Sequence, residues 1–156
     1  MPSPEHPANF ISLRIHLVCR IRRGFPLIPD HLQPELWAYV GGIVKRTGLM
    51  LYQVGGAKDH MHVFFGLPET VTAAAAVHSI MTKSSVWIRH QDVAKFQWQK
   101  SYGAFSVSAS HTDRTMSYIR RQKEHHSRRD FDTELAAIAR AYGIVPTNRG
   151  AWTQES

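Results

Sequence analysis

The chain has 156 residues, of which 43% are apolar and 20% charged, a balance that predicts a single folded domain (1–156) and excludes a disordered protein. It has no apolar run long enough to cross a membrane, no signal-like start and one cysteine, so we expect a bacterial cytoplasmic protein without a membrane partner. Its net charge of +7 favours a polyanionic partner such as nucleic acid.

Strands are predicted where apolar residues recur at every second position, and helices where they recur at helical spacing. In chain order these are a strand at 11–23, a helix at 36–48, strands at 49–54 and 58–68, a helix at 70–90, a strand at 102–110, and helices at 111–129 and 132–143. Thr70 or Thr72 is expected to cap the second helix and Thr112 the third. Gly55 and Gly56 are expected to form the turn of a hairpin.

This order predicts an α+β fold of the ferredoxin-like or RRM-like type. Its core is a βαββαβ antiparallel sheet with two helices on one face, followed by two added helices. Cys19 falls on the apolar side of the first strand and is predicted to be a core residue rather than a nucleophile. The other face of the sheet stays open in this arrangement, and the third helix is the natural cover for it.

Two histidines, His60 and His62, lie one residue apart in the third strand, within the letters KDHMHVFFGLP. Strand geometry places both on the open face of the sheet, because Met61 and Val63 belong to the covered core. Two interpretations remain open for the pair alone. The histidines are either polar positions on a solvated face or two metal ligands held rigidly side by side.

The third helix carries Tyr118 and Gln122, four residues apart and therefore on one helix face. A tyrosine packed beside a surface glutamine is the more common explanation for such a pair alone. Next to two histidines, however, the amide oxygen can complete a metal site, and the phenol can act as a nucleophile on a phosphate. His125 or His126 can replace Gln122 as the third ligand if the helix docks differently.

Together these residues resemble a known family. HMH at 60–62 resembles the HUH motif, and YIRRQKEHH at 118–126 resembles the tyrosine motif of the single-tyrosine HUH transposases, which include small insertion-sequence and REP-associated enzymes. The likeness spans about residues 10–131, which we take as the catalytic core; 132–156 would form a C-terminal helix and tail. Both motifs occur in the expected order and on the expected elements.

The resemblance implies a metal-dependent endonuclease and strand transferase acting on single-stranded DNA with hairpin ends. Tyr118 would be the nucleophile, forming a 5′-phosphotyrosine linkage, and His60, His62 and Gln122 would bind the divalent ion. The family ion is Mg²⁺ or Mn²⁺, and the imidazoles favour Mn²⁺. The tyrosine helix would complete the site of its own chain or that of a partner in a homodimer. When bound to DNA, the protein would be associated with the nucleoid.

A basic surface is expected to hold the DNA. Its members lie on the open sheet face and along the third helix, and they are Arg14, Arg20, Arg22, Arg114, Arg120, Arg121 and Lys123. The alternatives are a domesticated or non-catalytic protein that only binds single-stranded nucleic acid, and a replication or conjugation nuclease. Metal-dependent cleavage of a labelled hairpin would separate an active enzyme from a binding protein.

Overall fold

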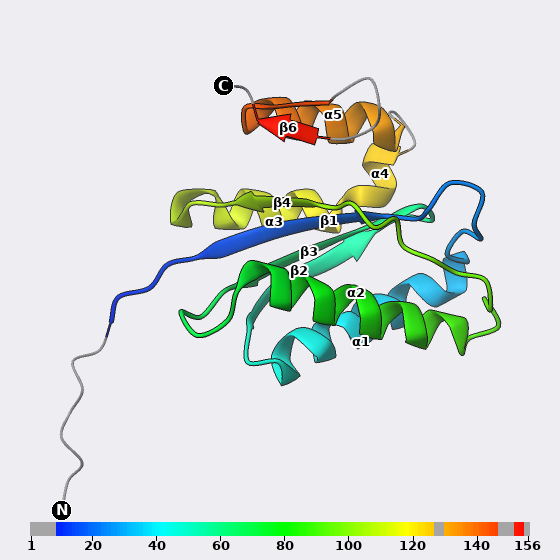
Figure 1. Ribbon diagram of the computed structural model, residues 1–156. Coiled ribbons are helices and arrows are strands. Elements are labelled where there is room, and N and C mark those ends of the chain that lie inside the picture. The colour runs from blue at the N-terminus through cyan, green and yellow to red at the C-terminus, as the bar shows by residue number, and fades with distance from the viewer. Residues whose placement is uncertain (1–8, 127–129, 147–151, 155–156) are drawn as a thin grey trace, which may run out of the picture.

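The computed structural model describes residues 9–126, 130–146 and 152–154. Its elements run from blue to red along the chain in Figure 1. The bounds are β1 Arg14–Arg20, η1 Asp30–Leu32, α1 Gln33–Arg46, β2 Met50–Gly56, β3 His60–Gly66, α2 Ala73–Arg89, β4 Gly103–Ser106, η2 Ala109–His111, α3 Thr112–Arg120, α4 Gln122–His126, α5 Phe131–Ala141, β5 Ile144–Pro146 and β6 Trp152–Gln154. None of the helices in these ranges is long and apolar enough to span a membrane.

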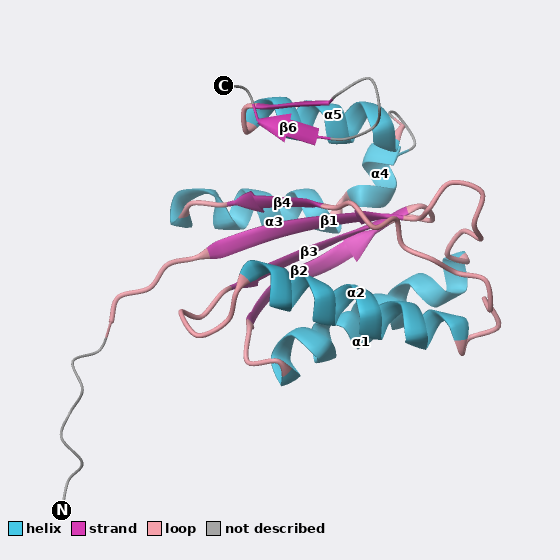
Figure 2. Ribbon diagram, in the orientation of Figure 1, coloured by secondary structure: helices cyan, strands magenta, loops and turns pink. Residues whose placement is uncertain are grey.

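Four strands form one antiparallel sheet in the order β2-β3-β1-β4, which confirms the predicted ferredoxin-like topology. Helices α1 and α2 lie together on one face, and α3, α4 and α5 lie on the other side (Figure 2). The chain is therefore an α+β protein with added helices over the face that the topology leaves open.

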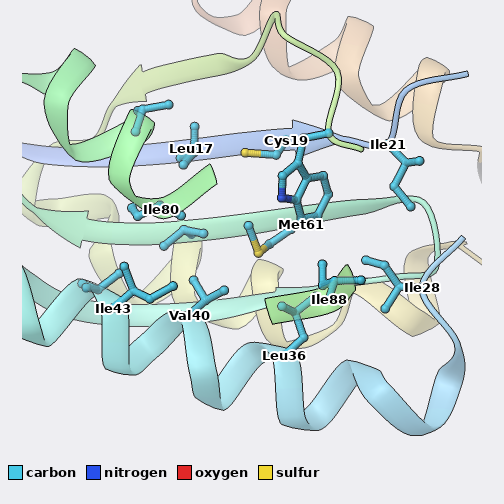
Figure 3. Close-up of a cluster of buried hydrophobic side chains, with 14 of the residues drawn as sticks. Leu17, Cys19, Ile21, Ile28, Leu36, Val40, Ile43, Met61, Ile80 and Ile88 are labelled. Carbon is cyan, nitrogen blue, oxygen red and sulfur yellow. The ribbon is translucent and has the colours of Figure 1, made fainter. Parts of the chain in front are cut away.

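The main core lies between the sheet and the two helices α1 and α2. Leu17 and Cys19 of β1 meet Met61 of β3 there, all without exposed surface, and Figure 3 shows Leu36 and Ile80 closing over them. Burial raises the pKa of the Cys19 thiol, which keeps it protonated at neutral pH. The interpretation of Cys19 as a core side chain rather than a nucleophile is thus confirmed.

The register of the sheet sets which side chains share the second face. Arg20 lies opposite His60, Val18 opposite His62, and His16 opposite Phe64, so these residues all point toward α3, α4 and α5. The face is not solvated, because His60 and His62 have no exposed surface and His16 has little. The first interpretation of the histidine pair, as polar positions facing water, is therefore wrong.

The helix predicted at 111–129 differs from the observed structure. It divides at Arg121 into α3 and α4, because Arg121 leaves helical geometry while its backbone N–H still bonds to the Ser117 carbonyl. Thr112 is the first residue of α3 and not its cap. Thr72 does cap α2, by accepting a hydrogen bond from the Ala75 N–H at 3.1 Å.

Gly55 and Gly56 also differ from their predicted place, because they are the last residues of β2 and not its turn. A Cβ atom at Gly55 would lie 2.6 Å from the Ile119 carbonyl oxygen of α3. Gly55 pairs with His62 across the ladder, so the missing side chain lets α3 approach the sheet directly beside the histidine pair.

We expect Gly55→Ala to push α3 away from β2 and to lower the free energy of unfolding by about 1 to 3 kcal/mol, as overpacking does. Urea unfolding followed by circular dichroism measures this loss. Gly42→Ala is the matched control, because its Cβ would meet only the flexible end of Arg46 inside α1, where alanine favours a helix. Equal stability of the Gly55→Ala variant and the native protein would contradict this role of Gly55.

Candidate metal and nucleophile site

His60 and His62 each have one ring nitrogen engaged by a neighbour. The Nδ1 atom of His60 lies 2.7 Å from the Asp59 carboxylate, which can only accept, so this nitrogen carries a proton. The Nδ1 atom of His62 lies 2.7 Å from Nε2 of His16. Burial lowers the pKa of His16 to about 4, so at neutral pH it is an uncharged ring able to accept from His62. These partners orient both rings, and the Nε2 atom of each ring points away from its Nδ1 partner.

Two oxygen-bearing side chains face the Nε2 atoms. The Oε1 atom of Gln122 lies 2.9 Å from Nε2 of His60, and Oε1 of Glu134 lies 3.8 Å from Nε2 of His62. The amide orientation of Gln122 is fixed, because its Nε2 donates to Glu134 at 3.1 Å and to the Tyr118 carbonyl at 3.3 Å. Gln122 and Glu134 are both buried, like the histidines.

This arrangement sets two lone pairs against each other. A neutral His60 that donates from Nδ1 presents an acceptor at Nε2, and the Gln122 oxygen facing it is also an acceptor. A proton or a cation resolves such a contact. Two ligands at right angles on a divalent ion about 2.1 Å away lie about 3 Å apart, which matches the observed spacing.

The residues present therefore fit a divalent ion. Donor atoms of His60, His62 and Glu134 all lie within 4.8 Å of one another, and Gln122 adds an oxygen beside them. Two imidazoles with two oxygens form a donor set that suits Mn²⁺ better than Mg²⁺. Burial raises the pKa of the Glu134 carboxyl to about 7, against the opposing influence of nearby His60.

Tyr118 lies on α3, which packs on β2 and β3 through a small apolar cluster around Phe64 and Ile119. Its ring meets that of His62 edge to face, with centroids 5.8 Å apart, and that of His16 at 6.4 Å. The predicted nucleophile therefore lies beside His62, whose ring centroid lies 5.0 Å from that of His60, all within a single chain.

The family model described as "Transposase IS200 like" matches residues 9–122, from the segment before β1 to Gln122 at the start of α4. This chain belongs to that family. Membership supports a DNA-cleaving and strand-transferring function for this IS200-like transposase. No curated protein matches its sequence at a significant level.

Two solved structures share the fold of the transposase. A putative transposase from Deinococcus radiodurans R1 is 17% identical, with a TM-score of 0.59, and the match covers 77% of this chain and 98% of the other. A REP-associated tyrosine transposase bound to a REP hairpin is 15% identical, with a TM-score of 0.55, and covers 80% of this chain and 74% of the other.

Glu134, His16, Asp59 and Phe131 join the site of the transposase without having been predicted as site residues. Glu134 and Phe131 come from α5, beyond the stretch that the family model matches, and the Phe131 ring stacks on His60 at 4.1 Å. His16 shares the strand alternation of Arg14 and Arg20, which places it on the same face, but alternation alone indicates no role for it. The side chains of His125 and His126, proposed as substitutes for Gln122, lie outside the described residues.

The basic residues expected to bind DNA fall into two groups. Those on the sheet face are engaged within the chain. Arg14 donates to Ser12 Oγ at 2.6 Å, Arg22 donates to Gln97 at 3.0 Å, and Arg20 forms an ion pair with Asp132 of α5. Those along the third predicted helix are exposed, and they are Arg114, Arg120, Arg121 and Lys123. Their contact with DNA remains a prediction.

Proposed function

We propose that this protein is a metal-dependent transposase that nicks and rejoins single-stranded DNA through a 5′-phosphotyrosine intermediate on Tyr118. One observation carries the proposal: the phenol ring of Tyr118 lies against His62 in the same chain, beside a buried group of nitrogen and oxygen donors. Family membership supports the DNA substrate, and the two-nitrogen, two-oxygen donor set supports the divalent ion.

His60, His62, Gln122 and Glu134 would hold the ion, and this donor set suits Mn²⁺ better than Mg²⁺. When bound, the ion would neutralise charge on the oxygens of the scissile phosphate. Asp59 and His16 position the imidazoles, since each accepts at an Nδ1 atom and so keeps Nε2 available.

Cleavage exchanges one phosphorus–oxygen bond for another. The Tyr118 hydroxyl loses its proton to solvent, its oxygen bonds to phosphorus, and the bond from phosphorus to the 3′ oxygen breaks. That oxygen takes up a proton and leaves as a free 3′-hydroxyl, while the 5′ phosphate stays on the tyrosine. Strand transfer is the reverse step with another 3′-hydroxyl, so the cycle needs no external energy source.

Hairpin recognition is also part of the proposal. The solved REP-associated tyrosine transposase is bound to a hairpin, and this chain shares its fold. The exposed basic residues of α3 and α4, including Arg120 and Lys123, offer cations for phosphate contacts near the nucleophile. Contact between Tyr118 and His62 of the same chain supports an enzyme that acts without a partner's tyrosine.

The test is to incubate the protein with single-stranded DNA from the flanks of its own gene and Mn²⁺, and to separate the products on a denaturing gel. We expect a labelled strand that migrates with the protein and disappears after protease treatment. If the label stayed on intact DNA for every flanking fragment and every divalent ion tested, the enzymatic function would be refuted.

His16→Phe tests the positioning role of His16. We expect about 10- to 100-fold weaker Mn²⁺ binding by calorimetry, because His62 then loses the acceptor that holds its ring. His16→Gln keeps an acceptor at this place and should recover part of the affinity. A His16→Phe variant that binds Mn²⁺ as tightly as the native protein would show that His16 only packs against His62.

A further inference from the structure

A pocket of about 580 Å³ opens beside the nucleophile, between the segment after β4, helix α3 and helix α5. Its lining includes His16 of β1, Arg114 and Tyr118 of α3 with His111 just before them, and Ile138 and Tyr142 at the end of α5. The volume falls within the range of sites for small organic ligands, and the mechanism described above makes no use of this space.

The position of the pocket connects it to the candidate site. His60 and His62 are fully buried, whereas Tyr118 and His16, which both contact His62, line the pocket. A DNA strand that brings a phosphate to Tyr118 through the pocket would place its neighbouring nucleotide there.

One wall of the pocket is apolar and aromatic. The Tyr142 ring stacks on Phe105 with centroids 4.8 Å apart, and 43% of the residue remains exposed. Ile138, one turn earlier in α5, continues this wall and packs on the apolar cluster that contains Phe105. A rigid aromatic ring supported from behind is a suitable surface for stacking a nucleobase.

The opposite side carries donors for a phosphate. Arg114 lies one helical turn before Tyr118, is exposed, and forms no ion pair with any residue in the described part of the chain. His111 precedes α3, and its Nδ1 atom lies within hydrogen-bond distance of Ser108 Oγ, at 2.8 Å. A guanidinium can bind a backbone phosphate there through two parallel hydrogen bonds.

We infer that this pocket binds the nucleotide adjacent to the scissile phosphate, with its base against Tyr142 and Ile138 and its outer phosphate against Arg114. The inference rests on the proposed function for the identity of the substrate, single-stranded DNA. The pocket would thus contact one base beside the cleavage point and give the enzyme a sequence preference at that position.

Ala141 lies on α5 in the pocket lining and is exposed, so Ala141→Trp would fill the space without entering the core. We expect this variant to bind a short fluorescent single-stranded oligonucleotide of random sequence about tenfold more weakly, the loss of one stacked base. Fluorescence anisotropy in the presence of EDTA measures this affinity without any cleavage of the oligonucleotide. Ala137→Trp, exposed one turn earlier and outside the pocket, is the matched control.

Arg114→Gln gives a second readout that does not depend on filling the pocket. We expect the slope of log affinity against log salt to fall by about 0.7, the value for one phosphate contact in single strands. Lys45→Gln on α1, exposed on the far side of the sheet, should leave the slope unchanged. An unchanged slope for Arg114→Gln would overturn the phosphate half of the inference.

Photocrosslinking locates the base directly. With an oligonucleotide carrying 5-iodouracil we expect a crosslinked peptide that contains Tyr142, and its loss in Ala141→Trp. Native-like affinity of Ala141→Trp, or crosslinks found only in other peptides, would overturn the inference. Displacement of the oligonucleotide by micromolar free dAMP would also overturn it, because the pocket would then be a site for a free nucleotide. These binding measurements need no metal and no phosphotyrosine product, so they succeed or fail independently of the proposed chemistry.

Discussion

Tyr118→Phe should form no covalent adduct with single-stranded DNA, a loss of more than about 1000-fold in rate, while keeping native stability and metal affinity. The ring packing against His62 and His16 is preserved in phenylalanine, so only the attacking oxygen is removed. A denaturing gel with labelled DNA and Mn²⁺ measures the adduct. Tyr102→Phe is the matched control, because Tyr102 is exposed and lies on another surface.

Mixing variants extends this prediction to the arrangement of subunits. The Tyr118→Phe protein keeps the metal ligands, and the His62→Ala protein keeps the nucleophile, so each carries one intact half of the site. Because Tyr118 meets His62 of its own chain, the mixture should stay inactive. Recovery of adduct in the mixture would show that the tyrosine helix is exchanged between partners in solution. An adduct on Tyr118→Phe alone would remove Tyr118 from the chemistry.

His60→Ala and His62→Ala should each weaken Mn²⁺ binding by more than the about 10- to 100-fold expected for a positioning residue such as His16. Each change removes a buried nitrogen donor that faces Gln122 or Glu134. Calorimetry measures the affinity, and the electron paramagnetic resonance spectrum of bound Mn²⁺ reports the loss of a nitrogen ligand. Adduct formation should fall in parallel.

His78→Ala is the control for the histidine variants, because His78 lies exposed on α2, on the other side of the sheet. It should bind Mn²⁺ as the native protein does. If His60→Ala and His62→Ala also bound Mn²⁺ normally, the ion would sit elsewhere, and the buried donor group would have only a structural role.

Strand periodicity allowed much of the site to be predicted. The alternation of β3 predicted the face of His60 and His62. The four-residue spacing predicted that Gln122 lies one turn from Tyr118, and Gln122 bonds to the Tyr118 carbonyl although the helix breaks between them. Both are short-range relations that the backbone geometry dictates. The family's motifs then gave these side chains a chemistry that the spacing alone left open.

Contacts between distant segments could not be predicted in this way. Glu134 reaches the site because α5 docks through Phe131 and Leu135 on a small cluster with Val18 and Phe105, a consequence of tertiary packing. The break at Arg121 has no glycine or proline to mark it, and continuous helical periodicity concealed it. The sequence pattern predicts a turn at Gly55 because it cannot show that α3 packs against β2 there.

The basic residues show the same limit from the side of electrostatics. Sequence placed Arg20 on the open face beside the histidines, and the register confirms that position. Its ion pair with Asp132 became visible only with α5 in place. Charge counting thus predicted the surface but not which cations are already neutralised within the chain.

Tandem mass spectrometry of the protein–DNA adduct after protease digestion tests directly whether Tyr118 carries the covalent bond. We expect that, only with Mn²⁺ present, an oligonucleotide is attached by its 5′ phosphate to the peptide containing Tyr118, and that a free 3′-hydroxyl strand is released. A metal-independent adduct, or one on any other residue, would contradict it.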